Sequence, residues 1–116
     1  MSPDRLRRSQ DIAAVFQSGR HRAGPLAVCH VRDRDDQGPT RLTVVASRKV
    51  GTAVARNRAK RLLREAARTL EWRRGQDVVL VARASCAEAN AHSVAVEVRE
   101  LAGHLNALDQ PLADAS

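Results

Sequence analysis

The segment VARNRAKRLLREAAR, residues 54–68, limits the possible folds more than any other part of the sequence. On a helix that advances about 100° per residue, its small and apolar side chains fall on one face. That face is formed by Ala55, Ala59, Leu62, Leu63, Ala66, Ala67 and Leu70. Because such a face must be covered, the segment predicts a helix from about Ala53 to Leu70 that packs on a sheet.

The other side of this predicted helix carries cations. Taking Arg56 as the origin, five basic residues lie within roughly 140° of one another. These five residues, which we call the cationic stripe, are Arg56, Lys60, Arg61, Arg64 and Arg68. Asn57 falls inside the stripe, where its amide can hydrogen-bond, whereas Arg58 stands apart at about 200°.

The positive charge of the chain is concentrated around this helix. Residues 41–68 contain nine Lys or Arg side chains and one carboxylate, Glu65, a local charge of +8, whereas the whole chain has +7. Solvated helix faces usually mix charges of both signs, so the stripe predicts a polyanionic partner. Neutralising about five phosphates predicts that log affinity falls against log salt with a slope of roughly −3 to −5.

The remaining patterns predict one α+β domain over residues 1–108 and a disordered tail over 109–116. Ser9 is expected to cap a first helix that ends at Gly19. Apolar runs predict strands at 26–32, 42–47 and 78–83, the first two as an antiparallel pair and the third in the centre. A final helix is expected over about 88–108, with an apolar stripe of Val94, Val98, Leu101, Leu105 and Leu108. The order of elements predicts a small sheet of about four strands with helices mainly on one face and the other face open.

The chain offers no convincing catalytic or metal-binding set. Asp33, Asp35 and Asp36 lie in a predicted turn, and the four histidines lack zinc-site spacing. Cys29 and Cys86 are widely spaced and are expected to be reduced thiols. We therefore expect no catalytic residues and no cofactor held by the chain. The absence of an apolar span or a secretory signal predicts a cytoplasmic protein without a membrane partner.

RNA is a better candidate partner than DNA. Two-helix DNA readers need consecutive helices, whereas the basic helix is predicted between strands. Single-stranded RNA is often held by aromatic stacking, but Phe16 and Trp72 are the only Phe, Tyr or Trp residues. Stacking is therefore expected to be sparse.

The stretch ASRKVGTAVARNRAKRLLREAAR resembles the signature of the protein subunit of bacterial ribonuclease P. RLRRSQDIAAVFQSGR and DVVLVARA also fit, so the resemblance covers about residues 5–105. Proteins of this family are not catalysts alone. They bind a large catalytic RNA, and together the two remove the 5′ leader of precursor tRNA. The resemblance also implies a left-handed βαβ crossover, as in a domain of a ribosomal small-subunit protein, and Mg²⁺ held mainly by the RNA.

The resemblance implies two RNA surfaces. The residues that match the signature region, which contacts the catalytic RNA, are Ser47, Arg48, Lys49, Arg56, Asn57, Arg58, Lys60, Arg61 and Arg64, and the stripe adds Arg68. The leader cleft is matched by Phe16 and strand residues 26–32, which include Val28 and His30.

This chain departs from the family in the leader cleft. The family often has aromatic residues where Ile12 stands and on the first long strand, where His30 is the nearest equivalent. An imidazole can stack or donate to phosphate, but His30 can equally be an ordinary strand residue. Phe16 can be either a core residue of its helix or a platform on which RNA bases stack.

The sequence leaves two other functions open. A structural RNA-binding protein of ribosomal type, with no role in tRNA processing, would share the fold and the basic patch. A basic amphipathic helix can also dock on acidic membranes. The helix at 53–70 has few large apolar residues, so vesicle binding is expected to be weak.

Overall fold

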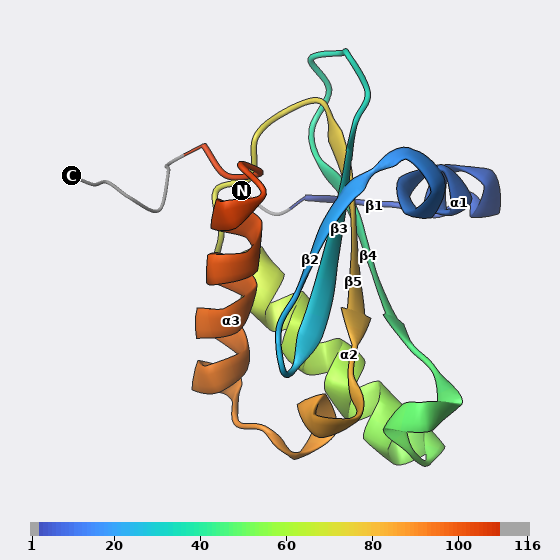
Figure 1. Cartoon of the computed structure of the whole chain (residues 1–116), viewed down its shortest axis with the longest axis vertical. Coiled ribbons are helices and arrows are strands. Elements are labelled where there is room, and N and C mark those ends of the chain that lie inside the picture. The colour runs from blue at the N-terminus through green and yellow to red at the C-terminus, as the bar shows by residue number, and fades with distance from the viewer. Residues whose placement is uncertain (1–2, 110–116) are drawn as a thin grey trace.

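The computed structural model describes residues 3–109 of the chain (Figure 1). Short 3₁₀ turns, η1 and η2, precede the second and third helices. In chain order the elements are β1 (Asp4–Arg5), α1 (Ser9–Ser18), β2 (Arg20–Ala23), β3 (Ala27–Asp33), β4 (Arg41–Ala46), η1 (Arg48–Val50), α2 (Ala53–Arg68), β5 (Gln76–Ala82), η2 (Ala84–Glu88) and α3 (Ala91–His104).

The strands form one mixed sheet in the order β1-β4-β5-β3-β2. β5 is central, as its apolar sequence predicted, and runs antiparallel to β3 and parallel to β4. The predicted antiparallel pair of β3 and β4 is wrong, because β5 lies between them. The five strands exceed the predicted four because β1 and β2 are short edge strands, which show little alternation of apolar and polar residues.

Two helices cover one face of the sheet. Figure 1 shows the sheet nearly edge-on, with α2 and α3 on the same side. The main core lies between these layers, and all five residues of the predicted apolar stripe of the last helix are buried in it. On α2 the buried residues are Ala59, Leu62, Leu63, Ala66 and Ala67. Burial of this face, at roughly 25 cal/mol per Å² of apolar area, is what holds the cationic helix on the sheet.

The opposite face of the sheet is only partly covered. α1 contacts β3 and β5 there, and a second, smaller core forms around Leu6, Val15 and Val79. In Figure 1 the sheet face below α1 has no helix over it within residues 3–109. The predicted arrangement, with helices mainly on one face and an open face opposite, is therefore confirmed.

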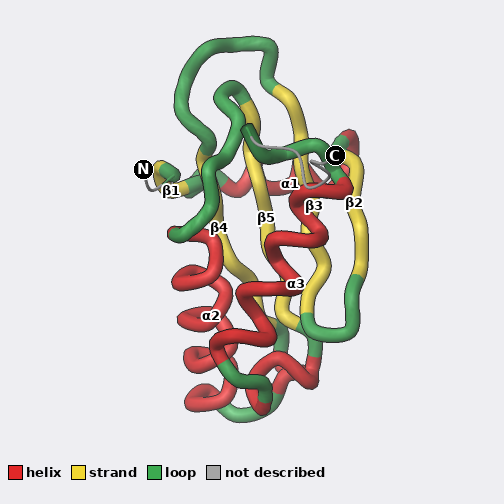
Figure 2. Tube along the Cα trace, turned by 90° about the vertical axis from the view of Figure 1, so that its left-hand side faces the viewer, coloured by secondary structure: helices red, strands yellow, loops and turns green. Residues whose placement is uncertain are grey.

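The crossover from β4 through α2 to β5 is left-handed. Both strands run down the page in Figure 1, and in Figure 2, where α2 lies in front of the sheet, the chain moves from β4 on the left to β5 on its right. Nearly all βαβ crossovers have the opposite hand. The hand expected from the family resemblance is confirmed.

The ends of the helices differ from the predictions in four places. α2 ends at Arg68, two residues before the predicted Leu70. Arg8, not Ser9, is at the N-cap of α1 and has no side-chain capping bond. α3 is shorter than predicted at both ends: Asn90 caps it by accepting from the Ser93 amide, and Asn106 follows with a φ of 58°. Leu108 instead pairs with Trp72 in an isolated bridge. The predicted disordered tail starts at Asp109, whose amide donates to the Glu71 carbonyl at 2.8 Å. Its other residues, 110–116, lie outside the described part.

Candidate nucleic-acid interface

Helix α2 presents the cationic stripe along its outer side. Thr52 caps the helix by accepting from the Ala55 amide at 3.2 Å. Steps of four residues from Arg56 keep the cations in line while the apolar positions turn to the core. Arg61, Arg64 and Arg68 are exposed, and Arg56 and Lys60 are half-buried. The helical phase derived from the sequence is thus confirmed.

The cations of the stripe have no carboxylate partner within residues 3–109. The ion pairs there belong to other arginines, namely Arg20, Arg34 and Arg41. Glu65, the only acidic residue of the helix, is exposed and makes no ion pair among the described residues. Like charges spaced four residues apart repel by a few tenths of a kcal/mol per pair, so an external anion would relieve the repulsion.

Arg58 differs from the stripe in what it contacts. Its Nε donates to the Ala87 carbonyl at 2.7 Å and its Nη2 to the Ala89 carbonyl at 3.1 Å. The side chain therefore fastens α2 to the segment that follows η2. Its position apart from the stripe was predicted from the helical phase, but this structural contact was not. Asn57, the neighbouring signature residue, is exposed.

The other predicted signature residues lie just before α2. Arg48 and Lys49 are exposed on η1, and Val50 anchors this turn in the core. The Ser47 hydroxyl accepts from the Lys49 amide at 3.3 Å, so part of its hydrogen-bonding capacity shapes the turn. η1 contacts α2, and Figure 1 places it beside the N-terminal end of that helix.

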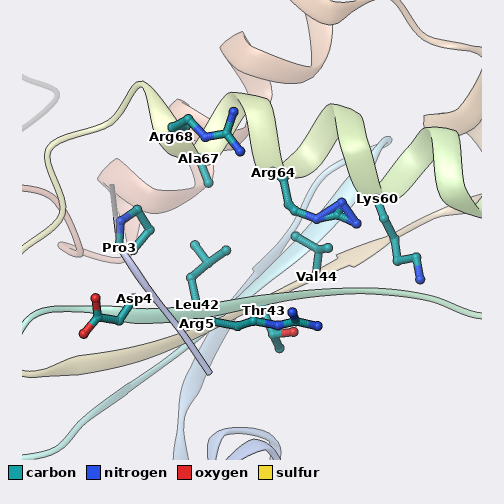
Figure 3. A pocket seen from close by; sticks show the side chains of 10 residues that line it. All are labelled: Pro3, Asp4, Arg5, Leu42, Thr43, Val44, Lys60, Arg64, Ala67 and Arg68. Atoms are coloured by element: carbon teal, nitrogen blue, oxygen red, sulfur yellow. The ribbon is translucent and has the colours of Figure 1, made fainter. Parts of the chain in front are cut away.

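A groove separates α2 from the β1 edge of the sheet (Figure 3). Its volume is about 320 Å³. One wall carries the C-terminal half of the cationic stripe, and the other carries β1 and the start of β4. Its lining residues are Pro3, Asp4, Arg5, Leu42, Thr43, Val44, Lys60, Arg64, Ala67 and Arg68. Three of its four cations, Lys60, Arg64 and Arg68, were predicted from the sequence to bind RNA, whereas Arg5 was not.

The open face of the sheet carries a cluster of rings. Phe16, 45% exposed on α1, meets His30 of β3 edge-on, with ring centroids 4.7 Å apart. His21 of β2 is registered with His30 and stacks on it at 5.3 Å. We call these three residues the ring cluster. Its exposed rings can stack on bases, and its imidazoles can donate to phosphates.

The other two predicted cleft residues flank the ring cluster. Val28 is half-buried, two residues before His30 in β3 and therefore on the same face of the sheet. Ile12 packs against the small core under α1. Ile12 thus supports α1, whereas Phe16 remains accessible. The sequence did not reveal His21 because β2 was not recognised as a strand, and only its register shows that the two histidines are neighbours.

Burial affects the ionisation of three groups near the sheet. The pKa of His30 is lowered from its ordinary value of 6.5, first by burial and then by the neighbouring His21. Burial raises the pKa of the Cys29 thiol to about 12, and burial also raises the pKa of Cys86. Neither thiol is poised to act as a nucleophile or a metal ligand. Within residues 3–109, no group of three or more His, Cys, Asp or Glu side chains could hold a metal ion.

The fold and these surfaces define a class of protein: a small cationic α+β protein with one charged surface and one ring-bearing surface. The family model for ribonuclease P matches residues 1–106. The chain is 38% identical over 86 residues to the ribonuclease P protein component of Bacillus cereus (strain B4264), which covers 72% of this chain and 75% of that relative. The chain therefore belongs to the ribonuclease P family, as a protein component of the holoenzyme that processes the 5′ ends of tRNA.

Solved structures agree with this assignment. The RNase P protein of Staphylococcus aureus has the same fold, with a TM-score of 0.78 at 19% identity, over 90% of this chain and 97% of that one. The RNase P protein of Thermotoga maritima gives a TM-score of 0.70 at 27% identity, over 84% and 93% of the two chains. Membership implies association with the RNA subunit. These comparisons give no support to the ribosomal-protein alternative.

None of the helices within residues 3–109 is long and apolar enough to cross a bilayer.

Proposed function

We propose that the chain binds the catalytic RNA of ribonuclease P through the cationic stripe and the neighbouring η1 turn. The observation that supports this most is the set of cations on α2 that lack carboxylate partners within the described residues. A structured RNA supplies phosphates along a surface of matching length. Arg48, Lys49 and Asn57 would add contacts beside the stripe. Arg58 would act mainly by holding α2 in place, because its guanidinium already donates to two backbone carbonyls.

The second part of the proposal concerns the open face of the sheet. We propose that the 5′ leader of precursor tRNA lies there in an extended form. The ring cluster would stack on one or two bases, and Val28 would provide apolar contact beside it. Stacking is typically worth about 1–3 kcal/mol per base. A leader that lacks base pairs suits a half-exposed sheet face better than a duplex does.

In this proposal the chain positions RNA and leaves hydrolysis to its RNA partner. No group of His, Cys, Asp or Glu side chains among its described residues fits a metal centre, so we assign Mg²⁺ to the phosphates of the catalytic RNA. The protein would contribute by neutralising charge and by orienting the leader. We propose that this function is carried out in the cytoplasm.

Reconstitution with the catalytic RNA tests the function directly. The purified chain alone should leave precursor tRNA intact. With the catalytic RNA, it should lower the Mg²⁺ concentration needed for half-maximal leader cleavage. A matched substrate with a leader shortened to one nucleotide should show a smaller effect, because it cannot reach the ring cluster. Cleavage by the chain alone, or an unchanged Mg²⁺ requirement, would refute the proposal.

The same preparation distinguishes RNA from DNA. Duplex DNA of equal length should compete poorly with the catalytic RNA in a filter-binding assay at 0.15 M salt, since α2 is flanked by strands and does not form a two-helix reader. Equal competition by DNA would show that the stripe recognises charge alone.

A further inference from the structure

The groove between β1 and α2 has a second cationic wall that the family signature does not include. β1 pairs in parallel with β4, and Arg5 is registered with Leu42. Leu42 faces the main core beneath α2, and registered residues share a face of the sheet. The Arg5 side chain is therefore directed to the side on which α2 lies. Asp4, registered with Arg41, belongs to the opposite face.

The charges of the groove favour an anion. Its lining has four cations and one carboxylate, a formal charge of +3. Within residues 3–109, none of the four cations makes an ion pair or a side-chain hydrogen bond, in contrast to Arg34 and Arg41. Figure 3 shows Arg5, Lys60 and Arg64 around the same space, while the Asp4 carboxylate points away from it. Asp4 therefore does not neutralise the three cations that meet in the groove.

The shape of the groove favours a polymer backbone. Leu42, Val44 and Ala67 give it an apolar floor between its cationic walls. β1 is registered only with Arg41 and Leu42, so the described part of the chain places no strand along the outer edge of β4 from Thr43 onward. The groove can thus continue along an open strand edge with free peptide groups. A ribose can lie on the apolar floor while its phosphates reach both walls.

We propose that this groove clasps a single-stranded stretch of the catalytic RNA backbone, with Arg5 as an RNA-binding residue opposite Lys60, Arg64 and Arg68. The proposal rests on the proposed function of the cationic stripe and deepens it. The stripe alone offers cations on one side of a bound RNA strand, whereas Arg5 of β1 adds a cation on the opposite side of the groove. The groove is on the α2 side of the sheet and the ring cluster is on the other side, which assigns the groove to the catalytic RNA and not to the leader.

Salt-dependent binding of the full-length chain to the catalytic RNA tests the groove. Arg5→Ala should reduce the salt slope by about 0.7 to 0.9, which corresponds to roughly five- to eightfold weaker binding at 0.1 M salt. Arg64→Ala should have a similar effect. Arg5→Lys should retain most of the affinity, because it keeps the charge. Arg99→Ala is the matched control: it removes one charge from the exposed face of α3 and should leave the slope unchanged.

The outcomes separate this inference from the proposed function. If Arg64→Ala lowers the slope but Arg5→Ala behaves like Arg99→Ala, the groove is not the site and the cationic stripe still is. If neither variant changes the slope, the proposed function fails as well. If Arg5→Ala weakens only the binding of leader-bearing substrate to the assembled holoenzyme, the groove belongs to the substrate and the inference is overturned. Arg5, Arg64 and Arg99 are exposed and make no ion pair among the described residues, so circular dichroism should show all variants folded.

Discussion

Asp77 is a fully buried carboxylate on which two arginines converge. Arg41 donates to it through Nε and Nη2, both at 2.8 Å, and Arg34 donates through Nη1 at 2.7 Å. The two arginines come from the two ends of the β3–β4 connection, and Asp77 lies on β5 between those strands. The cluster thus ties together two strands that do not pair directly. These cations are satisfied inside the protein, unlike those of the cationic stripe.

Removing this carboxylate should be costly. Asp77→Ala leaves two arginines without their partner and is expected to lower the free energy of unfolding by about 3 kcal/mol, measured by urea denaturation. The control is Asp33→Ala, whose ion pair with Arg20 is largely exposed. Its loss should cost less than about 1 kcal/mol. Equal losses in the two variants would show that the buried cluster does not stabilise the sheet.

His30 should make the stability depend on pH. Its folded-state pKa lies below 6.5, so the unfolded chain takes up a proton more readily than the native protein. The free energy of unfolding should therefore fall as the pH drops below about 6.5 and should continue to fall until the pH passes the folded-state pKa. His30→Tyr removes the titrating group, so the free energy of unfolding of this variant should fall less between pH 7 and pH 5. Identical pH profiles would exclude this role for His30.

At the scale of elements, the sequence predicted the long helices and strands, but it did not predict which strands pair in the sheet. α2 followed from its periodicity, and the apolar run of β5 indicated a central strand. The β3–β4 pairing failed because residues 34–40 resemble a hairpin connection, and no local signal shows that a later strand inserts between them. β1 and β2 have two and four residues, too few for a reliable alternation. Arg5 and His21 lie on these strands, which is why the sequence did not assign them to a site.

The repulsion along α2 predicts that anions stabilise the fold. A ligand that binds only the native state raises its stability by mass action. Polyphosphate should therefore raise the midpoint of thermal unfolding more than sodium chloride of equal ionic strength does. The double variant Arg64→Gln, Arg68→Gln should start from a higher midpoint without anion and gain less from polyphosphate. Equal gains in the double variant and the unmodified chain would contradict a specific role of the stripe.

At the scale of the whole molecule, the two surfaces lie on opposite faces of one sheet. The cationic stripe depends on the main core, whereas the ring cluster depends on α1 and the smaller core around Val15. The sheet is the only layer that they share among the described elements. Perturbations at separate sites without common partners usually add, so the two binding functions should be separable by mutation.

Paired variants test this separation in the reconstituted holoenzyme. Phe16→Ala should weaken binding of leader-bearing precursor tRNA by roughly 1–3 kcal/mol without changing the affinity of the chain for the catalytic RNA. Arg64→Ala should do the reverse. The double variant should show the sum of the two effects. A strong loss of affinity for the catalytic RNA in folded Phe16→Ala would mean that both faces contact the same molecule.

The position of β5 has a consequence for synthesis of the chain. The strand that joins the two halves of the sheet is made last, after β3, β4 and the whole of α2. A nascent chain that stops before Gln76 has β3 and β4 with open inner edges, and such edges are prone to aggregate. Chains released early should therefore be insoluble instead of forming smaller RNA binders. Both surfaces therefore depend on β5, because the sheet that carries them is joined only once residues 76–82 have been made.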